Sequence, residues 1–328
     1  NIIEVQLENS LNITSRPIIY LLKKIAIPAS TGSLFQTLFN IVDTFFAGQI
    51  SSDALAALAK SFPLYFLIIS AGIGIVAGCN SLISNSLGQR NRFAALIYTY
   101  HTLIYSILLS IVLTLIGVFF SYEILKLMGS STDSIYLAKE YTDIIFYGTL
   151  FFLILTSLNA VLYAQGDTKT YRNVLIIGLL ANIILNPLFI FGFLFIPAFG
   201  IAGLAISTIL IQFCACIYLF YKVNKTVLKI VIKTENFLIR KNFFINIFNQ
   251  CMPITFALFL VAVGSYILLY FISIFGDNAI AGYGAAIRFE HIFTLPVIGL
   301  NTAVITIAGQ NFGARRYDRV RDVYKKAL

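Results

Sequence analysis

The stretch AALIYTYHTLIYSILLSIVLTLIGVFF at residues 94–120 contains no Asp, Glu, Lys or Arg. A helix needs about 20 predominantly apolar residues to cross the ~30 Å hydrocarbon core of a bilayer, and this stretch is longer than that. It therefore predicts a helix that spans a membrane, and it sets the fold class for the segments on either side.

Seven further apolar segments of similar length are bounded by charged residues, Gly or Pro. The chain of 328 residues is 59% hydrophobic and 11% charged, whereas a soluble domain carries roughly 25% charged residues. The ~10-residue alternating segments of a membrane β-barrel are absent. We therefore predict an all-α membrane protein, a polytopic bundle of eight transmembrane helices. The other seven lie at about 20–47, 61–87, 142–164, 173–196, 201–221, 247–275 and 286–310.

The Lys and Arg residues are distributed unevenly between the two sides that these helices define. All but four of the 23 fall on one side, the exceptions being Lys60, Lys126, Lys139 and Arg288. Because positively charged loops stay in the cytoplasm, we predict that both ends of this chain lie on the cytoplasmic side of the cell (inner) membrane. The net charge of +9 is then a topology signal, and we expect the lipid bilayer, with no nucleic acid, as partner.

An internal repeat emerges when the chain is shifted by 225 residues against itself. Six spans per repeat is an even number, so both halves would have the same orientation, as in transporters with parallel repeats. We expect a whole protein of about 450 residues and twelve spans, of which this chain carries eight. The shift aligns Pro28 with Pro253, Gly74 with Gly299, Gly88 with Gly313 and Arg90 with Arg315.

The repeat and the charges together predict four regions. Residues 1–17 form a cytoplasmic tail, and 18–221 form a six-helix bundle. Residues 222–243 are a basic linker whose apolar side chains, among them Val231 and Phe237, suggest a segment lying on the membrane surface. Residues 244–328 begin a second bundle with two helices.

Polar residues follow one face of the first span. Ser33, Gln36, Asn40 and Asp43 are spaced by three, four and three residues, so they share a helical face. A carboxylate in a bilayer helix costs about 2.5–3.5 kcal/mol on insertion scales. We therefore interpret this face as a polar wall inside the bundle. The alternative is an interfacial Asp43 that faces extracellular water.

A second polar face lies on the fifth span. Asn182 and Asn186 are neighbours on one face, and Pro187 removes a backbone donor beside them. The two amides either line a polar interior or simply join two helices. The fourth and sixth spans add Thr156, Asn159, Tyr163, Ser207, Thr208 and Gln212.

These residues resemble the multidrug and toxic compound extrusion (MATE) transporters of the multidrug/oligosaccharidyl-lipid/polysaccharide exporter superfamily, in particular the DinF-like branch. The resemblance implies twelve spans in two bundles and export of cationic, amphipathic small molecules by H⁺ or Na⁺ antiport. It implies a monomer as the sufficient unit of the full-length protein. The matching stretches are IPAS…NIVDTFFAGQISSDALAALA (27–59), SLGQRN (86–91), AQGDTKTYRNVLIIGLLANIILNPLFIFG (164–192) and FGIAGLAISTILIQ (199–212).

The resemblance also implies a coupling site in the first bundle. The family's first-span acid falls on Asp43 and its fifth-span amide on Asn182, and nearby hydroxyls fall on Tyr141 and Thr208. A second acid usual in this branch is replaced by Asn186, which cannot titrate. The substrate cavity would involve Gln36, Asn40 and Asn159 together with aromatic rings, which attract cations.

The coupling ion stays open between two alternatives. Asp43 alone could exchange a proton, or Asp43, the amide oxygens and Thr208 could supply hard oxygen ligands for Na⁺. We expect no cofactor and no resident metal, because no phosphate-binding loop and no metal-ligand spacing occurs in the sequence.

The sequence supports three other functions less well. A lipid-linked oligosaccharide flippase of the same superfamily should need basic residues in its cavity, and spans 1–6 carry none away from their ends. A membrane-embedded enzyme would need an acid/base pair or a nucleophile, for which Asp43 has no visible partner. A channel would not account for the tandem bundles.

Overall fold

The structure is a computed structural model that describes residues 12–127, 132–194, 196–230, 240–273 and 277–328. The described residues are almost entirely helical, with an isolated bridge between Phe193 and Ile196. The helices are α2 (Ile18–Ile50), α3 (Ser52–Gly88), α4 (Arg92–Leu127), α5 (Thr132–Tyr147), α6 (Thr149–Ala164), α7 (Lys169–Phe191), α8 (Ile201–Asn224), α9 (Lys241–Ser273), α10 (Asp277–Gly313) and α11 (Tyr317–Ala327). The predicted all-α membrane protein is confirmed.

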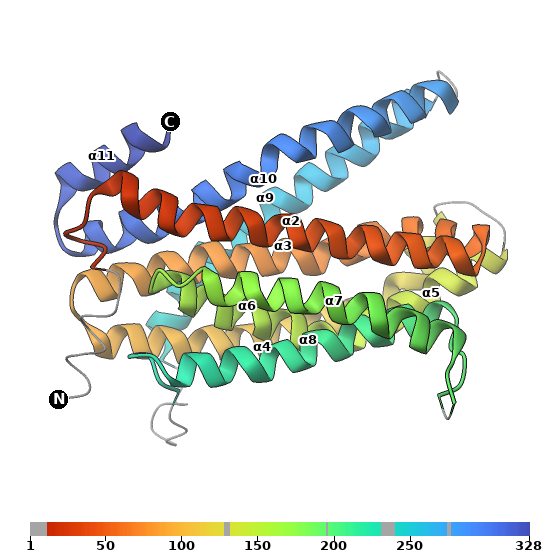
Figure 1. Cartoon of the computed structure of the whole chain (residues 1–328), viewed down its shortest axis with the longest axis horizontal. Coiled ribbons are helices and arrows are strands. Elements are labelled where there is room, and N and C mark those ends of the chain that lie inside the picture. Colours follow the sequence, from red (N-terminus) through yellow and green to blue (C-terminus); the bar gives the residue numbers. More distant parts are fainter. Residues whose placement is uncertain (1–11, 128–131, 195, 231–239, 274–276) are drawn as a thin grey trace.

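The number of spans agrees with the prediction. Seven of the described helices are long and apolar enough to cross a membrane, and the bent pair α5–α6 brings the number to eight. The chain runs back and forth along one direction, and α2 begins at the same end of the bundle at which α11 lies (Figure 1).

The fourth span differs from the continuous helix predicted at 142–164. It breaks at Gly148, between α5 and α6, with a bend of 48°. A Cβ atom at Gly148 would collide with the side chain of Ile209 on α8. The break therefore occurs where α8, a helix distant in the sequence, packs closely against the backbone at Gly148.

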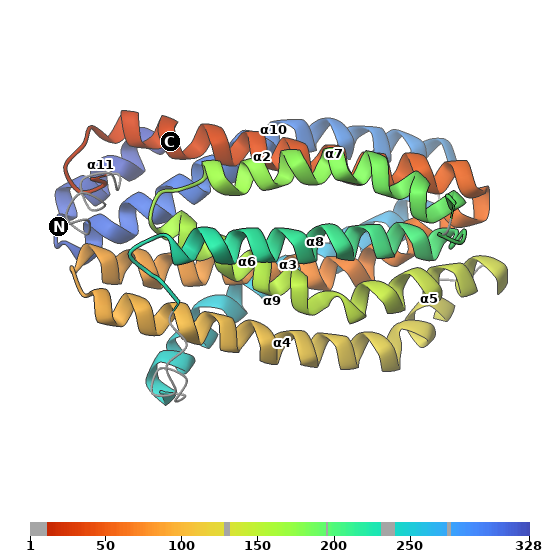
Figure 2. The same ribbon diagram turned by 60° about the horizontal axis from the view of Figure 1, so that its bottom comes forward.

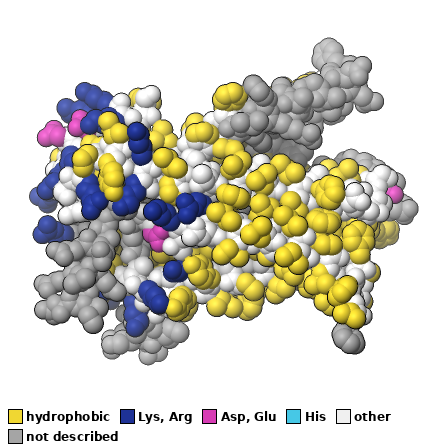
Figure 3. All heavy atoms as spheres, viewed as in Figure 1, with side chains coloured by type: hydrophobic (Ala, Val, Ile, Leu, Met, Phe, Trp, Pro, Cys, Tyr) yellow, Lys and Arg dark blue, Asp and Glu magenta, His cyan; other side chains and the backbone are white. Residues whose placement is uncertain are grey.

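The surface separates charged and apolar side chains along the long axis. Lys and Arg gather at the end where α2 begins and α11 lies, and hydrophobic side chains cover the visible face of the bundle beyond it (Figures 1 and 3). We call the first region the basic end. This distribution agrees with the charge pattern along the sequence, and the assignment of the basic end to the cytoplasm stays a prediction.

The internal repeat is visible in the backbone. Arg90 and Arg315, which the 225-residue shift aligns, are both left-handed, with φ of 58° and 57°. Each follows a helix end with matching hydrogen bonds: Arg90 N–H donates to Leu87 O at 3.0 Å, and Arg315 N–H donates to Phe312 O at 2.9 Å. The turns that end α3 and α10 are therefore equivalent.

The two halves also contact each other in an equivalent way. A Cβ atom at Gly74 of α3 would collide with Thr255 of α9, and a Cβ atom at Gly299 of α10 would collide with Ser30 of α2. Both pairs are related by the same 225-residue shift, as expected for a two-fold axis along the membrane normal. Away from these contacts α9 and α10 slant away from α2 and α3 toward the end opposite the basic end (Figure 1).

The predicted domain boundaries are not tested by these contacts and stay a prediction. The linker residues Val231 and Phe237 lie outside the described residues, as does most of the tail at 1–17. At the described start of the linker, Arg92 of α4 donates to Val227 O from Nε at 3.0 Å and from Nη2 at 2.8 Å.

Candidate functional site

A buried carboxylate joins α2 to α7. The side chain of Asp43 is 7% exposed, and Asn182 and Asn186 are fully buried. Asn182 Nδ2 donates to Asp43 Oδ1 at 2.8 Å, and Asn186 Nδ2 donates to the same oxygen at 2.9 Å. The structure therefore brings the three principal predicted residues together, and the two amides stabilise the ionised carboxylate.

The two amides also hold each other in place. They lie one helical turn apart on α7, and each donates to the other's Oδ1, at 3.3 Å from Asn182 and 3.2 Å from Asn186. The hydroxyl of Ser207 on α8 donates to Asn186 Oδ1. The site is thus a network across α2, α7 and α8.

The predicted hydroxyls are placed differently. Thr208 is buried, but its Oγ1 donates to Leu204 O at 3.0 Å within α8, and the neighbouring Ser207 makes the contact to the amides instead. Tyr141 on α5 is buried and close enough to Asp43 to interact electrostatically with its charge.

Tyr65 is a further tyrosine near Asp43, and the sequence pattern did not indicate it. It lies on α3 and also interacts electrostatically with Asp43, and its ring packs edge-on against Phe152 at 5.7 Å between centroids. A tyrosine hydroxyl within the predicted second span was the available signal, but 18 tyrosines are spread along the chain and the pattern does not distinguish this one.

The predicted cavity residues do not share one environment in the described chain. Asn159 on α6 is 3% exposed, and its Oδ1 has no hydrogen-bond partner in the described structure. On α2, Gln36 is half-buried and Asn40 is exposed. Their common role as a substrate cavity stays a prediction.

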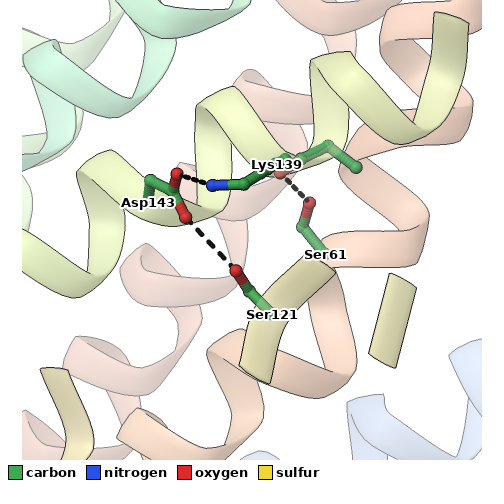
Figure 4. A network of polar contacts seen from close by, with 5 residues as sticks. Ser61, Ser121, Lys139 and Asp143 are labelled. Atoms are coloured by element: carbon green, nitrogen blue, oxygen red, sulfur yellow. Dashed lines mark hydrogen bonds and ion pairs between the residues drawn. The ribbon is translucent and has the colours of Figure 1, made fainter. Parts of the chain in front are cut away.

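A second polar network surrounds Lys139 and Asp143 of α5 (Figure 4), and α5 lies toward the end of the bundle opposite the basic end (Figure 1). Lys139 forms an ion pair with Asp143 one turn along α5, and Asp143 Oδ1 accepts a hydrogen bond from Ser121 at 3.2 Å. Ser61 Oγ donates to Ala138 O at 3.3 Å. This network joins α3, α4 and α5, and it differs from the first site because its carboxylate has a cationic partner.

The arrangement at Asp43 suits reversible binding of a small cation. The carboxylate offers hard oxygen ligands, which such cations prefer, and the two amides would add theirs only after turning, because their Nδ2 groups face Asp43. The carboxylate could also take a proton. Of the ion pairs within the described residues, the one found is Lys139–Asp143, so Asp43 is free to interact with a mobile cation.

Comparison with known proteins identifies the family. The MatE family profile matches residues 28–188 and 253–328. Its two segments begin at Pro28 and Pro253, the prolines that the internal repeat aligns.

Individual relatives agree with this match. The probable multidrug resistance protein YoeA of Bacillus subtilis is 30% identical over 308 residues, which are 92% of this chain and 66% of that protein. The FAD transporter of Shewanella oneidensis is 25% identical over 317 residues, or 96% of this chain and 70% of that protein. The chain therefore spans about two thirds of the length of these relatives.

The fold of a solved transporter also agrees with this family match. A solved MOP superfamily transporter from Pyrococcus furiosus superposes with a TM-score of 0.89 at 23% identity, over 97% of this chain and 70% of that one. The chain belongs to the MatE family, a family of multi-pass membrane transporters and not of enzymes.

Proposed function

We propose that this chain forms the first part of a secondary active exporter that removes cationic, amphipathic small molecules in exchange for H⁺ or Na⁺. The observation that carries the proposal is Asp43, a carboxylate buried between α2 and α7 that accepts two amide hydrogen bonds on one oxygen. The name of the relative YoeA, a probable multidrug resistance protein, supports the substrate class.

The geometry supplies a way to couple the ion to helix movement. Both interhelical hydrogen bonds end on Asp43 Oδ1, so a cation bound at this oxygen competes with them. Hydrogen bonds to a charged group contribute about 1.5–3 kcal/mol each, and one charge crossing 100 mV supplies about 2.3 kcal/mol. The energy of one charge is thus comparable to that of one of the two hydrogen bonds, so ion entry can weaken the contact between α2 and α7 and thereby change the affinity of the cavity for the substrate.

The two candidate ions act differently at this site. A proton neutralises the carboxylate, so that both amides lose a charged acceptor. A sodium ion requires the amides of Asn182 and Asn186 to turn their oxygens toward the carboxylate, which breaks their mutual hydrogen bonds. In both cases Asp43 is the coupling residue and Asn182 and Asn186 are its positioning partners.

A flippase or exporter of anionic substrates is the second candidate, favoured by the similarity to the FAD transporter of Shewanella oneidensis. Such a substrate needs cationic partners in the cavity. In α2 and α7, which carry Asp43 and the two amides, the basic residues Lys23, Lys24, Lys169 and Arg172 all lie in the first two turns or just beyond. A cationic substrate fits this charge distribution better.

Efflux measurements on membranes that contain the full-length protein test the proposal. Asp43→Asn keeps the shape of the side chain but removes its charge, and it is expected to abolish ion-driven efflux of a cationic dye. Asp143→Asn is the matched control, since it removes an acid of the same bundle that already has a cationic partner. Full efflux by Asp43→Asn at normal expression would exclude the proposed role.

A further inference from the structure

An apolar groove runs along the outer surface between α7 and α8. Its volume is about 310 Å³. Small residues on both helices, Gly178, Ala181 and Ala215, leave the space open, and Ile177, Leu210 and Tyr218 form its exposed rims. The groove belongs to neither of the polar networks described above.

The length of the groove corresponds to one leaflet of a bilayer. On α7 its lining residues extend from Val174 to Leu185, which is about 17 Å at 1.5 Å per residue. Half of a ~30 Å hydrocarbon core is about 15 Å. Val174 lies one turn from the start of α7 at the basic end, so the groove runs from that end to about the middle of the membrane.

Cationic side chains stand at the mouth of the groove. Lys222 Nζ lies 5.4 Å from the centroid of the Tyr218 ring, which lines the groove. One turn further along, Lys225 Nζ lies 4.3 Å from the centroid of the Tyr221 ring.

We propose that this groove is a binding site for an anionic phospholipid of the cytoplasmic leaflet. One acyl chain occupies the groove between α7 and α8, and the phosphate headgroup contacts Lys222 and Lys225. The apolar lining and the leaflet length of the groove favour an acyl chain, and the two lysines favour a negatively charged headgroup. Basic pockets between transmembrane helices on the cytoplasmic side are suited to such headgroups. A cationic drug is disfavoured by the same charges.

The site has a structural consequence for the first bundle. The groove is lined in part by Ile211, which with Phe39 and Leu179 forms a small buried cluster that joins α2, α7 and α8. These three helices also carry Asp43, Asn186 and Ser207. A bound lipid would therefore stabilise the helices that hold the candidate ion site, although its binding does not depend on what the transporter exports.

Native mass spectrometry of the purified full-length protein tests the proposal. The probes are phosphatidylglycerol and phosphatidylcholine with the same acyl chains. We expect phosphatidylglycerol to bind at least ten-fold more tightly. Lys222→Gln combined with Lys225→Gln should weaken its binding roughly thirty-fold, because each basic residue near an anionic surface contributes about a five-fold factor and the two factors multiply. Binding of phosphatidylcholine should stay unchanged.

Two further variants make the result specific. Arg321→Gln combined with Lys325→Gln removes two exposed charges from α11 and should leave binding of both lipids intact. Gly178→Leu fills the groove, where a Cβ atom would meet only Ile211 Cγ2 at 3.4 Å, and should weaken both lipids. Equal losses from the two charge-removing pairs, or unchanged binding when the groove is filled in a protein that elutes normally, would overturn the proposal.

Discussion

Asn186 donates a 2.9 Å hydrogen bond from α7 to Oδ1 of Asp43 on α2. A carboxylic acid at position 186 could make this contact only while it carries a proton, whereas the amide makes it permanently. Because Asn182 donates to the same oxygen, both amides favour the ionised form of Asp43. Replacement of the acid expected from the family resemblance thus yields a site with one titratable carboxylate instead of two.

Asn186→Asp is predicted to make efflux depend on H⁺, whichever of the two ions drives the wild type. The new carboxylate would lie within hydrogen-bonding distance of Asp43, and two like charges this close share a proton instead of both ionising. Efflux by the variant should follow an imposed pH gradient and need no Na⁺. The measurement is dye efflux from proteoliposomes under separate pH and Na⁺ gradients.

Asn186→Leu is the matched control for this substitution, because it removes the amide without adding an acid. It should abolish efflux under either gradient. Efflux by Asn186→Asp that requires Na⁺ would contradict the explanation.

Asp143→Asn is predicted to leave efflux nearly unchanged. The Lys139–Asp143 ion pair is partly exposed, at 34% and 23% of the two side chains, and pairs of this kind contribute about 0–1 kcal/mol. The measurements are dye efflux and the melting temperature in detergent. A loss of efflux as large as that of Asp43→Asn would show that the outer network also takes part in coupling.

Gly74→Ala and Gly299→Ala are predicted to destabilise the protein to a similar extent. An added Cβ atom would collide with Thr255 at one position and with Ser30 at the other, and overpacking of this kind costs about 1–3 kcal/mol. The melting temperature of each variant in detergent checks this. Gly264→Ala on α9 is the control, because its Cβ atom would meet nothing within 4 Å. Unequal effects of the first two would argue against equivalent contacts between the halves.

Cys79 and Cys251 are predicted to form a disulfide under a mild oxidant such as diamide, which takes up the two hydrogens. Their sulfur atoms lie 3.7 Å apart, on α3 and α9. The bond would fix the two halves to each other, so efflux should fall on oxidation and return after reduction with dithiothreitol. Cleavage at a protease site introduced in 222–243 would reveal the cross-link on a non-reducing gel.

Cys251→Ala removes one partner and should make efflux insensitive to the oxidant. Cys214→Ala removes an exposed free cysteine and should leave efflux as sensitive as in the wild type. Continued sensitivity of Cys251→Ala would contradict the assignment of the cross-link.

The features that depend on local pattern were predictable from the sequence. The spans followed from apolar length, and Asn182 and Asn186 followed from their spacing of one helical turn. The 225-residue repeat predicted that Arg90 and Arg315 are equivalent, and in the structure the same turn ends α3 and α10. Figure 2 shows these helices from a second side.

The features that depend on contacts between distant helices were not predictable. The break at Gly148 reflects the approach of Ile209 from α8. Ser207 and Thr208 are adjacent hydroxyls that point in directions about 100° apart on a helix, and the sequence does not show which one reaches Asn186. The exposure of Asn40, despite its place on the face of Asp43, depends on which helices pack against α2.

The central claim is that Asp43 carries the coupling cation. Proteoliposomes containing the full-length protein, loaded with a cationic dye, are given either an inward H⁺ or an inward Na⁺ gradient, and dye efflux is recorded with the wild type and with Asp43→Asn. The account predicts that one of the two gradients drives efflux by the wild type and that neither drives efflux by the variant. Gradient-driven efflux by Asp43→Asn at the wild-type rate would contradict it.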